Sequence, residues 1–346
     1  MYLTEKEIME QHFALKKTYQ YMMEKETEIK VFFEKHQERK FVFLGCGSSY
    51  MLAKSGQRLF AACKGTAADA IAGGDYLINP GYYRETVADS IVVSLSRSGK
   101  TSEIVRDVKQ IKENCGNPVI SISMKDKNDI MPYSDLNLTF PWSYDESVCQ
   151  TRTVTNLYTV LLLLNAFYNQ DKELLDSVKA AIDLNEAYKE EYRPVLEKIA
   201  RMEWENVTIL CDGAPSGIAQ EGALAFTEIA MLPGQCFQLL DYRHGPMVLN
   251  TKKTLTIALL QPNEDVLQRD MIEDLKGHGG TMVTVTNCTG NPYGVAENIN
   301  VGDIRRFEAW GIPFIYVMQM TAYSKSILLG RNPDQPTGLD AFITLK

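Results

Sequence analysis

Hydroxyl side chains gather where a buried strand gives way to a helix. The β-branched run Ile91–Val93 predicts the strand, and a helical pattern resumes with Ile104 and Val108. A loop in this place lies at the first helical turn, whose free N–H groups and positive dipole end attract anions. The loop consists of Ser96, Arg97, Ser98, Gly99, Lys100 and Thr101. One hydroxyl is enough to cap a helix, so three hydroxyls with a glycine favour a site for a phosphate monoester.

A second set of reactive side chains lies in the second half of the chain. Glu221 and Glu228 are seven positions apart, so both carboxylates can lie on one face of a helix. His244 follows in a tight loop, directly before a glycine and a proline. A carboxylate and a histidine can together move a proton beside a carbonyl, one at carbon and the other at oxygen. A solvated helix position for Glu228 and a loop hydrogen bond for His244 are the alternatives, and a phosphate site in the same chain favours the catalytic roles.

The segment Phe41–Phe60 repeats the strand–loop–helix pattern. Its turn holds Gly45, Gly47, Ser48 and Ser49. The third glycine of a dinucleotide-binding GxGxxG motif is absent. A loop with two hydroxyls at the end of a strand predicts a monophosphate rather than a dinucleotide.

The composition limits the classes of protein to which the chain can belong. Its 346 residues are enough for about two domains, and 45% of them are hydrophobic, which suffices for large cores. A formal charge of −8, with no block of basic residues, argues against a nucleic-acid surface. The seven cysteines are scattered without a CxxC pair, as in a reducing compartment. The start lacks a signal-peptide core, and the apolar run Leu157–Tyr168 is too short to span a bilayer. We therefore expect a soluble cytoplasmic protein that binds neither nucleic acid nor membrane.

The chain contains an internal repeat. Residues 207–226 align without a gap with residues 41–60, and the alignment pairs Gly213 with Gly47. Further apolar runs predict strands at Val119–Ser123, Thr254–Leu260 and Met282–Thr286, and a buried helix at Val154–Phe167. Strands that alternate with helices at this spacing predict an α/β fold with two similar, doubly wound parallel-sheet domains.

We expect five segments along the chain. They are an N-terminal helical arm (1–40), a first, phosphate-binding domain (41–170), a helical connector (171–205), a second domain with the catalytic helix (206–330) and a C-terminal tail (331–346). The arm is expected to pack on its own domain or on a partner subunit.

The two halves differ in their loops. Leu260–Asn263 replaces the hydroxyl loop, and Ala214–Pro215 replaces the two serines of the first loop. Proline lacks the N–H group that a phosphate cradle uses, and Glu264 and Asp265 would repel an anion. We therefore expect no phosphate in the second half.

The other histidines are His12, His36 and His278. We expect them at the surface, and their spacing is not that of metal ligands. Neither a metal ion nor a cofactor is expected.

These motifs, in this order, resemble those of the tandem sugar isomerase (SIS) domain family. The chain resembles most closely the isomerase half of glutamine–fructose-6-phosphate aminotransferase, and also the related phosphosugar isomerases and deaminases. The matching stretches are Cys46–Tyr50, Ser96–Thr101, Glu221–Leu224 with Glu228, His244–Pro246 and Asn332–Pro336.

The resemblance implies a role for each site residue. The implied phosphate contacts are Ser49, Ser96, Ser98 and Thr101, with Arg97 acting through its backbone; Gly47, Ser48 and Arg152 would be further substrate contacts. Glu228 would be the base that moves a proton between C1 and C2 of a sugar 6-phosphate, with Glu221 as the second candidate. His244 would be the acid and base of ring opening, contributed across the interface of a homodimer.

Two positions depart from the aminotransferase pattern. Ala225 and Ala341 stand where the aminotransferase has lysines, of which the second forms a Schiff base with the ketose. Its glutamine-hydrolysing domain also has no counterpart in this sequence. We therefore expect neither glutamine-dependent synthesis of glucosamine phosphate nor a covalent enzyme–substrate intermediate.

The residues leave two reactions open. One is aldose–ketose isomerisation, and the other is removal of nitrogen from an amino-sugar phosphate by a deaminase or deglycase. The alternative from another class is a non-catalytic phosphosugar-binding regulator. The presence of Glu228 and His244, and the lack of a DNA-binding module, argue against the regulator.

Overall fold

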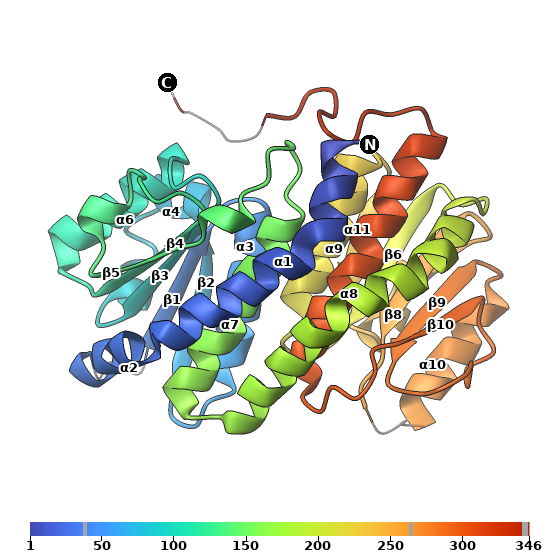
Figure 1. Ribbon diagram of the computed structural model, residues 1–346, viewed down its shortest axis with the longest axis horizontal. Coiled ribbons are helices and arrows are strands. Elements are labelled where there is room, and N and C mark those ends of the chain that lie inside the picture. Colours follow the sequence, from blue (N-terminus) through green and yellow to red (C-terminus); the bar gives the residue numbers. More distant parts are fainter. Residues whose placement is uncertain (37–39, 263–265, 341–344, 346) are drawn as a thin grey trace. The chain divides into compact units, whose positions relative to one another are not determined.

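The computed structural model describes residues 1–36, 40–262, 266–340 and 345. The described chain divides into two compact units, whose elements are labelled in Figure 1. The first unit comprises residues 13–146 and 152–175 and the described residues from 340 on, and the second comprises residues 1–12, 147–151 and 176–339. Each unit holds one five-stranded parallel sheet. The prediction of two similar α/β domains is therefore confirmed.

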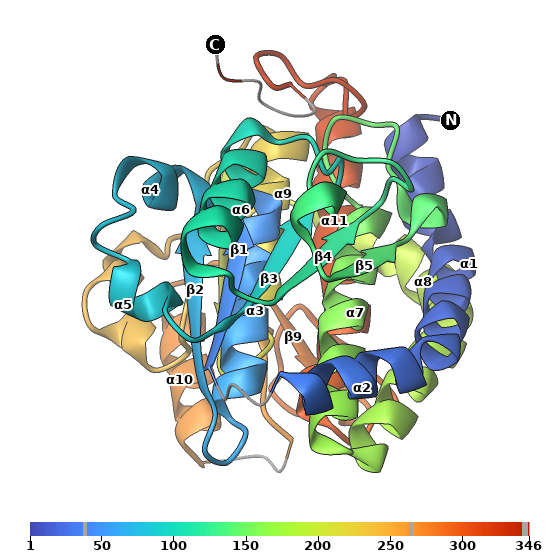
Figure 2. The ribbon, with the colours of Figure 1, turned by 90° about the vertical axis from the view of Figure 1, so that its left-hand side faces the viewer.

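The first sheet has the strand order β2-β1-β3-β4-β5, as Figure 2 shows. Its strands are β1 (Lys40–Gly45), β2 (Ala67–Ala72), β3 (Ile91–Ser96), β4 (Val119–Ser123) and β5 (Leu136–Thr139). The chain leaves β1 toward one edge of the sheet and leaves β3 toward the other edge. The loops that follow β1 and β3 therefore lie side by side at the switch point of the sheet, the usual place for ligands in this class of fold.

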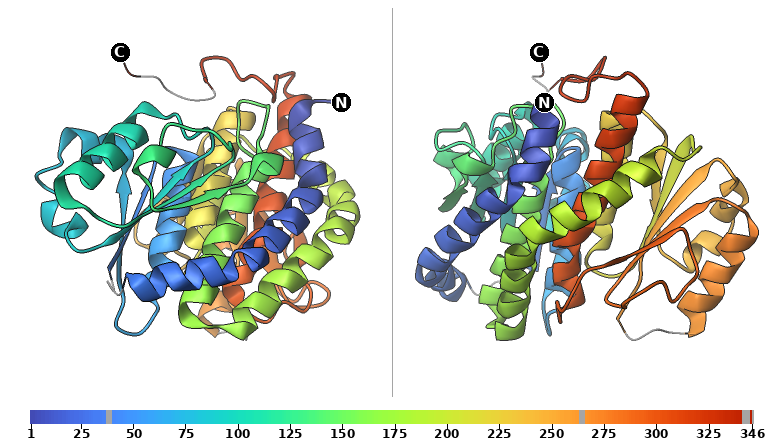
Figure 3. Two further views of the ribbon diagram at one scale, coloured as in Figure 1. Left: turned by 60° about the vertical axis from the view of Figure 1, so that its left-hand side comes forward. Right: turned by 45° about the vertical axis from the view of Figure 1, so that its right-hand side comes forward.

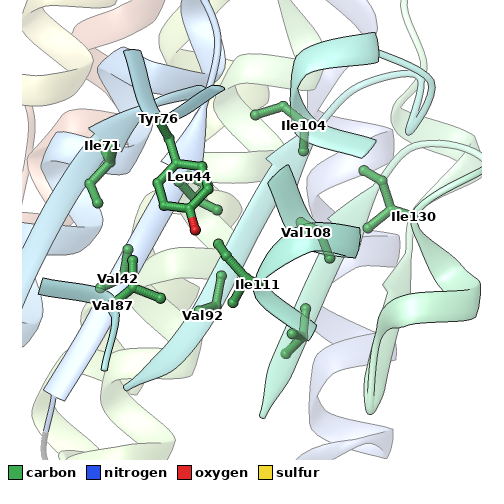
Figure 4. Packing of buried hydrophobic residues seen from close by; sticks show 11 residues of the cluster. Val42, Leu44, Ile71, Tyr76, Val87, Val92, Ile104, Val108, Ile111 and Ile130 are labelled. Carbon is green, nitrogen blue, oxygen red and sulfur yellow. The ribbon is translucent and has the colours of Figure 1, made fainter. Parts of the chain in front are cut away.

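Helices cover both faces of the first sheet. The helices of this unit are α2 (Glu26–Lys35), α3 (Ser48–Ala61), α4 (Gly73–Ile78), α5 (Arg84–Val87), α6 (Ser102–Cys115) and α7 (Arg152–Asn169), with short 3₁₀ turns at Met131–Tyr133 and Pro141–Ser143. Figure 4 shows the core under α4 and α6, where Ile111 of α6 lies beside Val92 of β3. On the other face, Gly56 of α3 lets that helix approach the ring of Phe43, since an added β-carbon would lie 2.6 Å from it.

The second sheet has the order β7-β6-β8-β9-β10, which matches the first strand for strand. Its strands are β6 (Asn206–Cys211), β7 (Gly234–Phe237), β8 (Thr254–Leu259), β9 (Thr281–Thr286) and β10 (Glu297–Asn300). The right-hand panel of Figure 3 shows these strands side by side, with α10 in orange against them. The paired glycines of the repeat also match in backbone, because Gly47 has φ 54° and Gly213 has φ 66°.

Four longer helices accompany the second sheet. They are α8 (Lys172–Ala200), which begins in the first unit, α9 (Ser216–Ile229), α10 (Val266–Gly277) and α11 (Gly311–Leu328), with 3₁₀ turns at Asp241–Arg243, Pro246–Leu249 and Phe307–Trp310. Figure 1 shows α9 beside α11, and a β-carbon on Gly222 would lie 1.9 Å from the sulfur of Met318. Close approach at this glycine fixes α9 against its neighbour. No helix of the described ranges is long and apolar enough to cross a membrane.

The N-terminal helix α1 (Leu3–Glu24) is held at its start by the C-terminal segment. The carboxylate of Asp334 accepts hydrogen bonds from the backbone N–H groups of Leu3 (2.9 Å) and Thr4 (2.8 Å). A carboxylate satisfies free N–H groups at a helix start and complements the helix dipole. The tail motif that contains Asp334 therefore has a structural role in the second unit.

The prediction that His12 lies at the surface is wrong. Its side chain is buried on the inner face of α1, where Nδ1 lies 2.8 Å from Nζ of Lys189 and Nε2 lies 3.4 Å from Glu186. His12 is four residues after Ile8 and three before Leu15, both fully buried, so helical periodicity places it on their face. His278 is exposed, as expected.

Candidate functional site

The hydroxyl loop folds around its own side chains. The backbone N–H of Gly99 donates to Oγ of Ser96 (3.0 Å), and that of Lys100 donates to Oγ of Ser98 (3.1 Å). Oγ of Ser96 also lies 3.4 Å from Oγ1 of Thr101, the residue that precedes α6. Since the two serine oxygens accept from the backbone, their own protons are available to an anion. The three hydroxyls predicted to bind phosphate therefore lie together.

A neighbouring segment braces this loop. The N–H of Met124 donates to the carbonyl of Arg97, and the N–H of Asp129 donates to the carbonyl of Gly99, both at 3.0 Å. Asn128 packs directly on Gly99. These contacts hold the loop rigidly at the end of β3, and the sequence analysis did not identify them.

The first loop has matching geometry. Gly47 precedes α3, and Ser48 and Ser49 form the first turn of that helix, each 4% exposed. A β-carbon on Gly45 would lie 2.4 Å from the backbone of Ser49, so only glycine lets the helix start this close to the strand. Because Leu44 of β1 pairs with Ser94 of β3, both loops open at neighbouring strand ends. The roles of these residues in binding substrate stay predictions.

Arg152, the first residue of α7, holds the loop before it. Its Nε (3.2 Å) and Nη2 (2.5 Å) donate to the carbonyl of Tyr144, and its Nε lies 3.6 Å from Asp145. Asp145 in turn accepts from the N–H of Thr153 at 2.9 Å. The guanidinium of Arg152 thus fixes the position of Tyr144, and its predicted contact with substrate stays untested.

A buried acidic group that the sequence analysis did not predict lies near Cys46, at the end of β1. Asp107 of α6 is fully buried, and neither carboxyl oxygen has a hydrogen-bond partner among the described residues. A β-carbon on Gly73 would lie 2.9 Å from the sulfur of Cys46 and 3.1 Å from Oδ2 of Asp107, so thiol and carboxyl flank that glycine. Burial, with the charge of Glu103 next, raises the pKa of Asp107 to about 8. Burial likewise raises the pKa of Cys46 to about 11, again with Glu103 as the second cause.

The two candidate carboxylates lie on α9 of the second unit. Glu221 is 1% exposed, whereas Glu228 is partly exposed near the end of the helix. A β-carbon on Gly234 would lie 2.1 Å from the carbonyl oxygen of Ala223, which shows how tightly β7 passes this helix. Ala225 is buried and offers no amine. Ala341, the other expected lysine position, lies outside the described residues.

The loop with His244 is anchored on both sides of the histidine. Tyr242 is buried in the core under α10, and Nη2 of Arg243 pairs with Asp270 (3.0 Å) and Asp274 (2.7 Å) of that helix. The side chain of His244 is exposed. The loop is thus fixed to its own unit and presents the imidazole outward.

The loops of the second unit lack the features of the first. Pro215 precedes α9, and the N–H of Gln261 is occupied by Oε1 of Gln268 at 2.8 Å. The loop residues Asn263, Glu264 and Asp265 lie outside the described part. The expectation that no phosphate binds here stays a prediction. Within the described ranges, no three His, Cys, Asp or Glu residues are grouped so as to hold a metal ion.

Comparison with known families identifies the first half of the chain. Residues 36–169 match the family model described as "SIS domain". The chain contains a SIS domain. This segment includes both hydroxyl loops and α3 to α7, so the resemblance to the SIS family is confirmed.

Relatives and solved structures extend the similarity to nearly the whole chain. The glutamine–fructose-6-phosphate aminotransferase [isomerizing] of Escherichia coli (strain K12) is 23% identical over 316 residues, covering 88% of this chain and 51% of the relative. The chain thus spans about half the length of the curated relatives it matches. The structure of tagatose-6-phosphate ketose/aldose isomerase from Escherichia coli is similar with a TM-score of 0.86 and 17% identity, covering 99% of this chain and 96% of that one. Glucosamine-6-phosphate deaminase from Thermotoga maritima gives a TM-score of 0.74 at 23% identity, covering 95% of this chain and 100% of the other. These two likenesses establish the SIS fold.

Proposed function

We propose that this protein is an enzyme that acts on a sugar 6-phosphate by moving a proton between C1 and C2. The reaction is either aldose–ketose isomerisation or removal of nitrogen from an amino-sugar phosphate by a deaminase or deglycase. The observation that carries the proposal is the pair of hydroxyl loops at the neighbouring ends of β1 and β3. The names of the similar proteins, an aminotransferase, a ketose/aldose isomerase and a deaminase, support this class of reaction.

In this proposal the first unit binds the phosphate. Ser96, Ser98 and Thr101 would donate their hydroxyl protons to its oxygens, and Ser49 would do so from the adjacent loop. The N–H groups at the starts of α3 and α6 would add uncharged donors. The gathered hydroxyls of the 96–101 loop support this assignment, because their oxygens are already oriented by the backbone.

Glu228 and His244 would supply the proton chemistry. Glu228 would accept the proton at C2 of the open aldose, giving an enediol, and return it to C1 to complete the ketose; Glu221 is the second candidate for this base. His244 would open the ring by protonating the ring oxygen and would then shift the proton between O1 and O2. With an amino sugar, the enolamine would be protonated at C1, and water would hydrolyse the resulting C2 imine to ketose and ammonia. None of these steps uses a lysine.

We also propose that the working form is a homodimer in which His244 serves the partner's site. His244 is exposed and is followed by Val248 and Leu249, which are 76% and 62% exposed. Large apolar side chains this exposed beside a candidate catalytic residue favour contact with a second copy of the chain.

A substrate panel tests the proposal. The protein is incubated in heavy water with fructose-6-phosphate, tagatose-6-phosphate, glucosamine-6-phosphate and galactosamine-6-phosphate. Exchange of the proton at C1 or C2, followed by NMR, is expected for at least one of them. Exchange without ammonia identifies an isomerase, and release of ammonia identifies a deaminase.

The alternative is a non-catalytic regulator that binds a phosphosugar. Tight binding of one sugar phosphate with neither exchange nor ammonia would support it and would overturn the enzyme proposal. Absence of any binding would overturn both. The partly exposed Glu228 and the outward-facing His244 favour the enzyme.

A further inference from the structure

We propose that Lys125 neutralises the phosphate group bound at residues 96–101. In this proposal the ring of Tyr144 positions the ammonium group of Lys125 for the contact. The proposal rests on the phosphate site of the proposed function. It adds a charged contact from a residue outside the 96–101 loop, which itself offers uncharged hydroxyl and N–H donors and the cations Arg97 and Lys100.

The backbone of Lys125 is tied to the hydroxyl loop. Strand β4 ends at Ser123, which pairs with Ser96 at the end of β3. The next residue, Met124, donates its N–H to the carbonyl of Arg97. Lys125 follows, and its own carbonyl accepts from Nδ2 of Asn128 at 3.0 Å. The backbone of Lys125 therefore lies directly beside the predicted phosphate site.

The side chain of Lys125 is held over an aromatic ring rather than in an ion pair. Its Nζ lies 3.4 Å from the centroid of the Tyr144 ring, and Cζ of Arg97 lies 5.7 Å from the same centroid. In the part of the chain that the structure describes, no carboxylate forms an ion pair with Lys125, and Asp126 beside it accepts from Oγ1 of Thr139. A ring face attracts an ammonium group but does not use its N–H donors. These donors are free for an anion.

The backbone that carries the Tyr144 ring is held in place. The carbonyl of Tyr144 accepts two hydrogen bonds from Arg152 at the start of α7. Two cations, Lys125 and Arg97, therefore face one ring, which extends from this anchored backbone. This arrangement pre-orders a long, flexible side chain, which reduces the entropy lost when the ammonium binds a ligand.

The negative charge of a phosphate ligand would attract the ammonium group of Lys125. A phosphate monoester carries between one and a half and two negative charges near pH 7, because its second pKa is about 6. Glu103 lies in the first turn of α6 and opposes an anion there. Lys125 would therefore add to the positive charge of Arg97 and Lys100 in the loop and favour the dianion over the monoanion.

The test measures binding of fructose-6-phosphate, tagatose-6-phosphate and inorganic phosphate by calorimetry from pH 5.5 to 8. We expect the wild-type protein to bind at least one probe more tightly as the second phosphate proton is lost. Lys125→Met should weaken that binding about tenfold or more at pH 8, the range of a charge-assisted hydrogen bond, and less at pH 5.5. Lys127→Met is the matched control, because this exposed lysine lies two residues away on the same segment.

The outcomes separate this inference from the phosphate site itself. An affinity of Lys125→Met equal to that of the wild type, or an equal loss in Lys127→Met, would overturn the role of Lys125 while leaving the site intact. Failure of the wild type to bind any probe would overturn the phosphate site and the inference with it. Tyr144→Phe keeps the ring and should bind like the wild type, whereas Tyr144→Leu should lose part of the affinity. Circular dichroism checks that each variant is folded.

Discussion

A β-carbon placed on Gly99 would lie 2.4 Å from the β-carbon of Asn128. Asn128 cannot retreat, since its Nδ2 donates to Oγ of Ser123 (2.9 Å) and to the carbonyl of Lys125 (3.0 Å). Gly99 also has φ 62°, a conformation that residues with a side chain rarely adopt. The shape of the hydroxyl loop therefore depends on this one glycine and the amide behind it.

Gly99→Ala should destabilise the protein and weaken binding of a sugar phosphate. The left-handed backbone alone costs roughly 1–2 kcal/mol, and the contact with Asn128 adds to it by displacing the loop. Urea unfolding measures the first effect and calorimetry the second. Gly116→Ala is the control, because Gly116 has φ 67° at the other end of α6 and open space around it. Equal losses in both variants would show that Asn128 does not brace the loop.

Ser98→Ala combined with Thr101→Val should weaken phosphate binding without unfolding the protein. Each hydrogen bond to a charged group contributes about 1.5–3 kcal/mol, so the loss is on the order of a hundredfold or more. Calorimetry with the sugar phosphate that the wild type binds gives the affinity, and thermal unfolding checks stability. Unchanged affinity would remove these residues from the site.

Asp107→Asn should stabilise the folded protein increasingly as the pH rises. The unfolded carboxyl ionises near pH 4, whereas burial and the charge of Glu103 raise its pKa to about 8 in the folded protein. Below about pH 4 the carboxyl of Asp107 is neutral in both the folded and the unfolded state, so its ionisation does not lower the free energy of unfolding. Between pH 4 and 8 the folded state must keep its proton, so wild-type stability falls by up to about 1.4 kcal/mol per pH unit. Urea unfolding of both proteins at pH 5 and pH 8 measures the growing difference.

Asp135 provides a control of opposite sign. Burial opposes its ionisation, but hydrogen bonds from Lys112 and from the N–H of Val119 outweigh burial and lower its pKa. The carboxylate of Asp135 therefore stabilises the folded state above about pH 4, and this contribution disappears as the pH falls through the lowered pKa. Asp135→Asn should accordingly lose stability at pH 7. A pH-independent difference for Asp107→Asn would mean that its carboxyl is solvated.

The sequence predicted the strands that carry the loops, because their β-branched runs end in glycine and hydroxyl residues. It did not predict the edge strands β5 and β10, four residues each with alternating polar side chains, which give no apolar run. Helix α11 is apolar on every side and so shows no amphipathic period. The internal repeat could be found from the sequence because the backbone has a positive φ at both Gly47 and Gly213, which favours glycine in each unit.

The candidate site was predictable only where its residues are close in sequence. The hydroxyl loop is one continuous motif, whereas Lys125 and Tyr144 are nineteen positions apart, with strand β5 between them. Asp107 left a signal that the sequence analysis did not use. It is three residues after Ile104 and four before Ile111, both buried, so periodicity alone placed it on the inner face of α6.

Glu228→Gln should abolish most turnover while the substrate still binds. Glutamine keeps the shape of the side chain and removes the base, and loss of a general base costs about 10²–10⁴-fold in rate. Exchange of the C1 and C2 protons in heavy water measures the effect. Glu221→Gln is the comparison on the same helix face. Normal exchange in Glu228→Gln together with loss in Glu221→Gln would assign the base to Glu221.

The homodimer proposal makes a prediction that neither single variant can test. His244→Ala chains and Glu228→Gln chains are each expected to be nearly inactive. If His244 serves the partner's site, a mixed dimer has one site with both substitutions and one site with both native residues. Mixing equal amounts should then produce half of the dimers as mixed species, each with one active site, so activity recovers toward about a quarter of the wild-type value.

The recovery depends on subunit exchange, which also supplies the control. The two variants are unfolded together in urea and refolded as a mixture, and in parallel they are refolded apart and combined afterwards. Recovery is expected in the first sample and, if the subunits exchange slowly, only later in the second. A double variant that carries Glu228→Gln and His244→Ala in one chain is refolded with the wild type. Each site of the resulting mixed dimers should then contain only one intact residue of the pair. These mixed dimers should be inactive. No recovery in the co-refolded variants, with mixed dimers demonstrated by native mass spectrometry, would place Glu228 and His244 of one chain at the same site.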